Sequence, residues 1–197
     1  GASAAINVFQ AVLCLHGWPH IWLPISRAWC YAGARMQYSD LGPGDGAVGK
    51  GAFEWCGEHG VCHQGEAGDT DYAKDDVSLK WATRGIPAEI IALGKDNPLT
   101  DAFPVTTAKK AADVLWSGGC VTIASNQGFK QRRDADGFDT PSGNWAHQMH
   151  LHDIIVTASG RRGFACSQSW GEDGGGITGP LLPQQPAYVF GIDWDVA

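Results

Sequence analysis

Hydrophobic residues recur at helical spacing in four stretches of the first 116 residues. In the first stretch Ile6, Phe9 and Leu13 lie three or four positions apart among further apolar residues, which predicts a buried helix. The third stretch stops at Gly60, a residue typical of helix ends. The predicted helices cover residues 3–15, 25–34, 48–59 and 107–116.

From Cys120 onward the period changes to that of strands, beginning with Cys120-Val-Thr-Ile-Ala. The predicted strands cover residues 120–124, 147–157, 163–169 and 187–193. Helices followed by strands is the order of an α+β protein. We therefore expect one α+β domain over residues 1–197, with a helical N-terminal lobe to about residue 100 and a β lobe over about 101–197.

Composition narrows the class of protein. With 44% hydrophobic and 18% charged residues, the 197-residue chain is not a disordered one. The longest apolar runs fall well short of 18 residues, so we expect no membrane-spanning helix. A net charge of -7 without a basic stretch argues against a nucleic-acid partner. No signal peptide is present in these residues, so we expect a reducing compartment in which most of the six cysteines are free thiols.

The β half carries a histidine and an amide side chain whose separation along the chain is informative. His147 enters a predicted strand in Gly143-Asn-Trp-Ala-His, and Gln168 follows about twenty residues later in Gln-Ser-Trp-Gly. A strand, a turn and the neighbouring strand bring two such side chains face to face. This pattern resembles the papain-like cysteine peptidases. The resemblance implies that His147 is the base, that Gln168 orients its ring, and that Trp145 and Trp170 pack around and shield the pair.

The first half also resembles this family. The Gly-rich stretch Gly46–Val61 is similar to the family's Gly-rich segment and the helix that follows it. Counting back places the nucleophile at the start of the first helix, at Ser3, which lies 144 residues before His147, within the range of about 130–150 for this family. The resemblance implies a papain-like two-lobe fold with an antiparallel, β-barrel-like C-terminal lobe. It also implies a shared cleft lined by Ser3, His147 and Gln168.

Three departures from the family pattern bear on function. Ser3 stands where the family has cysteine and by itself is also a good helix N-cap, and Gln168 stands where the family has asparagine. The family's oxyanion-hole glutamine would fall before Gly1. These three departures, at the nucleophile, the orienting residue and the oxyanion donor, indicate a non-catalytic module. The alternative is an amide hydrolase of peptidase type with Ser3, native or replacing a cysteine, as nucleophile.

The amino-acid sequence of the second half is similar to that of phage and prophage members of the family, in the segments Ser125-Asn-Gln-Gly-Phe and Arg133-Asp-Ala-Asp-Gly-Phe. It implies a virion or assembly component whose partners are protein subunits, located in the host cytoplasm or the virion. If the chain is an enzyme, its substrate is a peptide.

No cofactor is expected, and metal sites are the weaker interpretation of two clusters. The first is a group of two cysteines and two histidines that lacks the usual Cys-x-x-Cys spacing for zinc, so a structural role is favoured. Its members are Cys56, His59, Cys62 and His63. His150 and His152 share a predicted strand face, opposite to that of His147, but no third ligand has a suitable spacing. We expect these two histidines to be polar residues of the surface.

Overall fold

The computed structural model describes residues 25–38, 41, 46–68, 76–99, 102–167 and 189–193. The chain divides into two compact units, Gly1–Pro104 and Val105–Ala197, which are described separately. The predicted helix over residues 3–15 lies outside the described residues.

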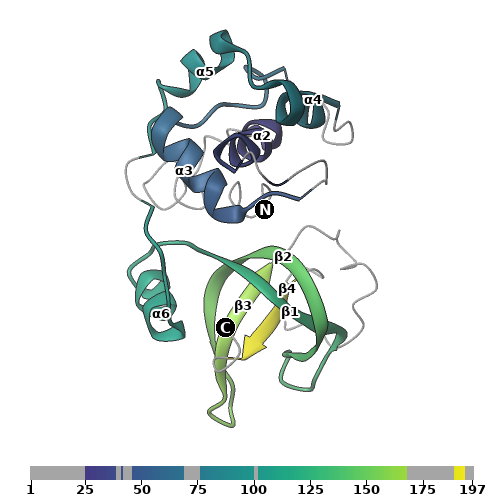
Figure 1. Ribbon diagram of the computed structural model, residues 1–197. Coiled ribbons are helices and arrows are strands. Elements are labelled where there is room, and N and C mark those ends of the chain that lie inside the picture. Colours follow the sequence, from purple (N-terminus) through teal and green to yellow (C-terminus); the bar gives the residue numbers. More distant parts are fainter. Residues whose placement is uncertain are drawn as a thin grey trace. The chain divides into compact units, whose positions relative to one another are not determined.

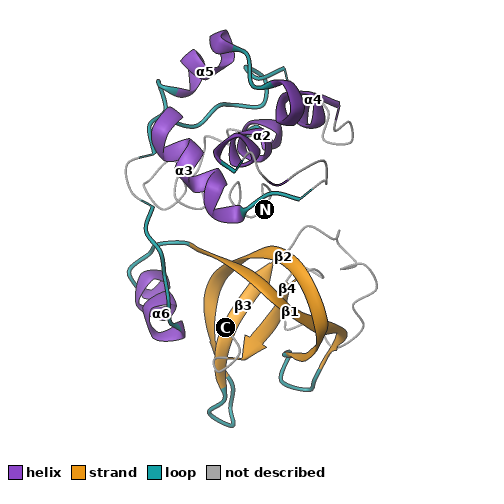
Figure 2. Ribbon diagram, in the orientation of Figure 1, coloured by secondary structure: helices purple, strands orange, loops and turns teal. Residues whose placement is uncertain are grey.

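The first unit is built from helices (Figures 1 and 2). Helices α2 (Arg27–Gln37) and α3 (Gly49–His59) confirm the two predictions for this region. Helices α4 (Asp76–Arg84) and α5 (Ala88–Gly94) were not predicted. The longest helices among the described residues of the whole chain have 11 residues, and none is long and apolar enough to cross a membrane.

Two tryptophans organise the core of this unit. Helix α2 begins where the Ser26 hydroxyl accepts a hydrogen bond from the Trp29 backbone N–H at 3.0 Å. The Trp29 ring packs edge-on against Trp55 of α3 at 5.3 Å, and its Nε1 donates to the Gly60 carbonyl at 3.1 Å. Gly60 ends α3 with a φ of 78° and lies so close to Gly94 that a Cβ would sit 1.8 Å from that carbonyl oxygen. Only glycine fits there.

In the described part of the second unit, a helix packs on an antiparallel sheet (Figures 1 and 2). Helix α6 (Ala108–Trp116) confirms the fourth predicted helix, and the Thr107 hydroxyl caps it by accepting from the Lys110 N–H at 3.2 Å. The strands pair antiparallel in the order β1-β2-β3-β4. Their bounds are Val121–Arg133, Asp139–Val156, Arg162–Ser167 and Val189–Asp193.

The α+β class is therefore confirmed, with one difference in the sheet. Among the described strands β1 and β4 form the two edges, and no ladder joins them. The sheet is open where the expectation was barrel-like. Its core lies between the sheet and α6, which contributes Ala111 and Ala112 to a cluster with the fully buried Met149 and Phe164.

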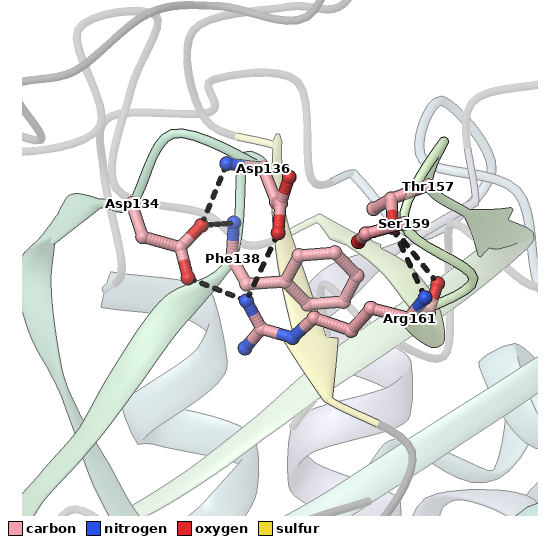
Figure 3. A network of polar contacts seen from close by, with 6 residues as sticks. All are labelled: Asp134, Asp136, Phe138, Thr157, Ser159 and Arg161. Atoms are coloured by element: carbon pink, nitrogen blue, oxygen red, sulfur yellow. Dashed lines mark hydrogen bonds and ion pairs between the residues drawn. The ribbon is translucent and has the colours of Figure 1, made fainter.

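Strand β2 is sharply bent. Its 18 residues would extend about 60 Å if the strand were straight. Yet the segments that flank its two ends are in contact, because the Arg161 Nη1 lies 2.5 Å from the Asp134 Oδ2 (Figure 3). Arg161 also stacks on the Phe138 ring at 4.1 Å. Bulges bend strands, and the register of β2 shifts between Asp139 and His147 and again between Leu151 and Asp153.

Candidate functional site

His147 lies near the middle of the bent strand β2, between its two irregular regions. It pairs with Ser125 of β1. On one side, three steps along β2 from Asn144 to His147 match only two steps along β1. On the other side, two steps along β2 from Leu151 to Asp153 match one step along β3. Bulges of this kind re-aim side chains and are common beside active sites.

A row of aromatic rings leads to His147. The Trp145 and His147 ring centroids are 5.8 Å apart with planes at 68°, an edge-to-face pair. On its other side, Trp145 lies 5.6 Å from Phe129 of β1, at 53°. Phe129 is buried in the core, whereas Trp145 and His147 are half-buried. The imidazole therefore lies at the border between packed core and solvent, with its Nε2 atom buried.

Hydrogen bonds between side chains and the backbone stabilise the irregular hairpin next to this row of rings. The Gln127 side-chain amide donates to the carbonyl oxygens of Gly128 and Gly143, at 2.8 and 3.2 Å. The Ser125 hydroxyl accepts from the Gln127 backbone N–H at 2.9 Å. Gly128 allows a close approach of the strands, since a Cβ there would lie 2.5 Å from the Ser142 carbonyl oxygen. These contacts keep the register shifts beside His147 in place.

The other three residues of the predicted site, Ser3, Gln168 and Trp170, lie outside the described residues. Gln168 directly follows Ser167, the last residue of β3, and Ser167 pairs with His150 of β2. The described part of the predicted site is thus His147 with Trp145. Phe129 could not be predicted as their neighbour from spacing, because the shifted register of the hairpin determines which β1 residue meets Trp145.

The second face of the sheet also carries polar side chains. Gln148 is buried, and its side-chain N–H donates to the Thr122 hydroxyl at 3.0 Å. His150 is only 6% exposed, and burial, with a smaller contribution from the charge of His152, lowers its pKa to about 4. The expectation that His150 is a surface residue was wrong, whereas His152 is exposed as predicted. The intervening bulge gives the two histidines different environments although their rings lie 5.8 Å apart.

Three of the described cysteines, Cys62, Cys120 and Cys166, do not have the properties of nucleophiles. All five described cysteines are free, in agreement with the sequence expectation. Burial raises the pKa of Cys62 to about 11, with a further contribution from Glu66, and burial also raises the pKa of Cys120. Burial, together with the charge of Asp139, raises the pKa of the fully buried Cys166. A nucleophilic thiol needs a lowered pKa, so these three are structural.

The weaker metal candidates are dispersed. Cys56 and Cys62 are fully buried in the core of the first unit, and the His59 ring packs on Trp55 at 3.9 Å. The backbone N–H of His63 faces the Glu66 carboxylate at 3.4 Å. Within the described ranges, no three His, Cys, Asp or Glu side chains form a group that could hold a metal ion.

Solved structures with a similar fold are cysteine proteases. The bromelain protease from Ananas comosus, solved with the inhibitor E64, matches with a TM-score of 0.59 at 17% identity, over 100% of this chain and 80% of its own. Xylellain, a cysteine protease from Xylella fastidiosa, matches with a TM-score of 0.64 at 15% identity, over 98% of this chain and 71% of its own. Digestive procathepsin L 3 from the larval midgut of Tenebrio molitor matches with a TM-score of 0.54 at 14% identity, over 96% of this chain and 56% of its own.

These similarities show the fold. The prediction of a papain-like α+β fold is confirmed, and identities of this size carry nothing further by themselves. No protein-family model matches the chain, and no curated protein matches it.

Proposed function

We propose that this protein is an amide hydrolase of the papain-like peptidase type in which His147 is the general base. The observation that carries the proposal is the placement of His147: half-buried, beside a bulge of β2 and packed against Trp145, in a chain whose fold is that of cysteine proteases. The substrate class is a peptide. Gln168 is the proposed orienter of the imidazole, and Ser3 is the proposed nucleophile.

The proposed reaction is an acyl transfer. As the Ser3 Oγ attacks the substrate carbonyl carbon, its proton passes to the His147 imidazole. When the carbon–nitrogen bond breaks, the imidazolium returns that proton to the leaving amine. Water, deprotonated by His147, then attacks the acyl ester. As the ester bond breaks, the imidazolium returns that proton to the Ser3 oxygen, which releases the acid and restores the Ser3 hydroxyl. Gln168 supports the ring by hydrogen bonding in this scheme.

Covalent labelling tests this proposal. A fluorophosphonate probe reacts with activated hydroxyls and an epoxysuccinyl probe with activated thiols, and mass spectrometry identifies the modified residue. The expected result is labelling that is lost in His147→Ala and retained in His152→Ala, the matched control, because His152 is an exposed histidine of the same strand. Absence of labelling by both probes, or equal labelling in wild type and His147→Ala, contradicts the proposal.

A second candidate is a non-catalytic binding module, such as a phage virion or assembly component with protein partners. The observations that favour it are serine at position 3 and glutamine at position 168, where the papain-like family has cysteine and asparagine. For this candidate, a Ser3→Ala variant assembles normally into its particle and neither covalent probe labels the wild type. Labelling that depends on His147 contradicts it.

A further inference from the structure

Trp145 connects the candidate base to the core of the second unit. Its ring contacts Phe129 on one side, with centroids 5.6 Å apart, and His147 on the other, at 5.8 Å. Phe129 is 8% exposed and belongs to the cluster that contains Met149 and Leu151, both fully buried. Close packing fixes the rotamers of such buried side chains. A continuous contact therefore runs from a fixed core residue through Trp145 to the imidazole.

The backbone alone leaves the direction of His147 dependent on local packing. In a regular strand the pleat determines where each side chain points. Here the ladder is irregular, because Asn144 and His147 are three steps apart on β2 while their partners Gln127 and Ser125 are two steps apart on β1. Gly143, just before this region, has a φ of 65°. A packed neighbouring ring then becomes important for selecting the imidazole rotamer.

We propose that Trp145, held in place by Phe129, is a positioning residue that fixes the orientation of the His147 imidazole. This inference rests on the proposed function of His147. An edge-to-face pair has a preferred interplanar angle, observed here at 68°, so Trp145 favours one orientation of its neighbour. A general base must lie within hydrogen-bond reach of the proton that it takes, so its orientation affects the chemical step more than substrate binding.

The variants that test this are Trp145→Leu, Trp145→Phe and Phe129→Leu, with Trp116→Leu as the matched control. Trp116 belongs to the same unit but is 87% exposed. The first readout is the NMR order parameter of the His147 Cε1–Hε1 bond, assigned by comparison with His147→Ala. It should fall below about 0.6 in Trp145→Leu, fall part of the way in Phe129→Leu, and stay at the wild-type value in Trp145→Phe and Trp116→Leu.

The second readout is kinetic. In Trp145→Leu we expect kcat to fall at least tenfold with KM unchanged, and Trp145→Phe should restore most of that loss because it keeps an aromatic edge against the imidazole. If Trp145→Leu does not fold, Phe129→Leu still tests the inference. An unchanged His147 order parameter in every folded variant that lacks an aromatic ring at position 129 or 145 overturns it.

The two readouts separate this inference from the proposed function. The relaxation measurement needs no turnover. If the imidazole is ordered in the wild type and mobile in Trp145→Leu, the positioning contact is supported, whatever the labelling experiment shows. If labelling of the wild type does not depend on His147, the proposed function is contradicted, but the positioning contact is not.

Discussion

The ion pair between Arg161 and Asp134 joins the segments that flank the two ends of β2, and a single substitution, Arg161→Met, breaks it. In the wild type the Arg161 Nη1 lies 2.5 Å from the Asp134 Oδ2 and 3.7 Å from the Asp136 Oδ2, and the guanidinium stacks on Phe138 at 4.1 Å (Figure 3). The Asp134 Oδ1 also accepts from the backbone N–H groups of Asp136 and Phe138, at 3.0 and 2.9 Å. Methionine keeps an unbranched apolar side chain beside Phe138 and loses the charge.

The magnitude follows from exposure. The Arg161 and Asp134 side chains are 32% and 38% exposed, so solvent weakens their ion pair and its contribution is about 0.5–1 kcal/mol. The stacking on Phe138 adds about 0.5–1 kcal/mol. We therefore expect Arg161→Met to lower the free energy of unfolding by about 1–2 kcal/mol. Arg161→Lys should recover only part of this, because an ammonium neither stacks as well nor presents a planar fork.

A double-mutant cycle with Asp134→Asn isolates the ion pair, because asparagine keeps an oxygen that accepts the two backbone N–H groups. The assay is urea unfolding followed by circular dichroism at pH 7, for wild type, both single variants and the double variant. The expected coupling energy is about 0.5–1 kcal/mol, reduced in 1 M salt. A coupling energy of zero at pH 7 and low salt would refute this explanation of how the ends of β2 are held together.

The same pair predicts a pH dependence. Burial by itself would raise the pKa of Asp134, but the hydrogen bonds from Arg161, Phe138 and Asp136 and the charge of Arg161 lower it below the usual value. A carboxylate with a lowered pKa in the folded state contributes stability above its unfolded pKa, and that contribution is lost as the pH falls through the folded value. The coupling energy should therefore be constant from pH 7 to 5 and should decrease as the pH falls below the ordinary aspartate pKa of about 4 towards the lowered folded value.

Two further predictions concern single residues. Gly60→Ala should lower the free energy of unfolding, measured with urea, by more than about 2 kcal/mol, because a Cβ at φ 78° would lie 1.8 Å from the Gly94 carbonyl oxygen. The matched control is Gly57→Ala, at an exposed site of α3 with open space around it, which should be neutral or stabilising. Equal effects of the two substitutions would contradict the argument. His150 has a folded pKa of about 4, below the unfolded value of about 6.5, so the unfolded chain binds the extra proton between these values and stability should fall by up to about 3 kcal/mol from pH 7 to pH 4. His150→Gln should remove most of that slope. Burial also lowers the pKa of His152, so His152→Gln should flatten the slope too, but less than His150→Gln does. Identical slopes in wild type and His150→Gln would contradict the burial of His150.

Periodicity and capping residues made much of the fold predictable. Helices α2, α3 and α6 carry an apolar stripe and capping or terminating residues such as Ser26, Thr107 and Gly60. Helix α4 escaped prediction because it begins inside a polar, acidic stretch rich in turn residues, and its stability depends on contacts such as that of the buried Trp81 with the core of the first unit. The N-terminal half of β2, before His147, has no alternation of apolar and polar residues; pairing with β1 across several bulges makes it a strand.

The candidate site was predictable only in part, because it too depends on irregular pairing of the strands. His147 and Trp145 could be selected because a motif in the sequence contains both. The contact of Trp145 with Phe129, and that of Arg161 with Asp134, depend on register shifts and on a bend that bring together residues 16 and 27 positions apart. The burial of His150 depends on another bulge, between Leu151 and Asp153. Sequence spacing carries little information on such irregularities.

The most direct test of the proposed function is the rate of hydrolysis of a fluorogenic peptide library by the wild-type protein and by His147→Ala, with His152→Ala as the control. Removal of a general base costs a factor of about 10² to 10⁴ in rate. We predict a loss of at least about 10² in His147→Ala and none in His152→Ala. Equal rates in wild type and His147→Ala, or no hydrolysis by the wild type, would contradict the assignment of His147 as the base of a papain-like hydrolase.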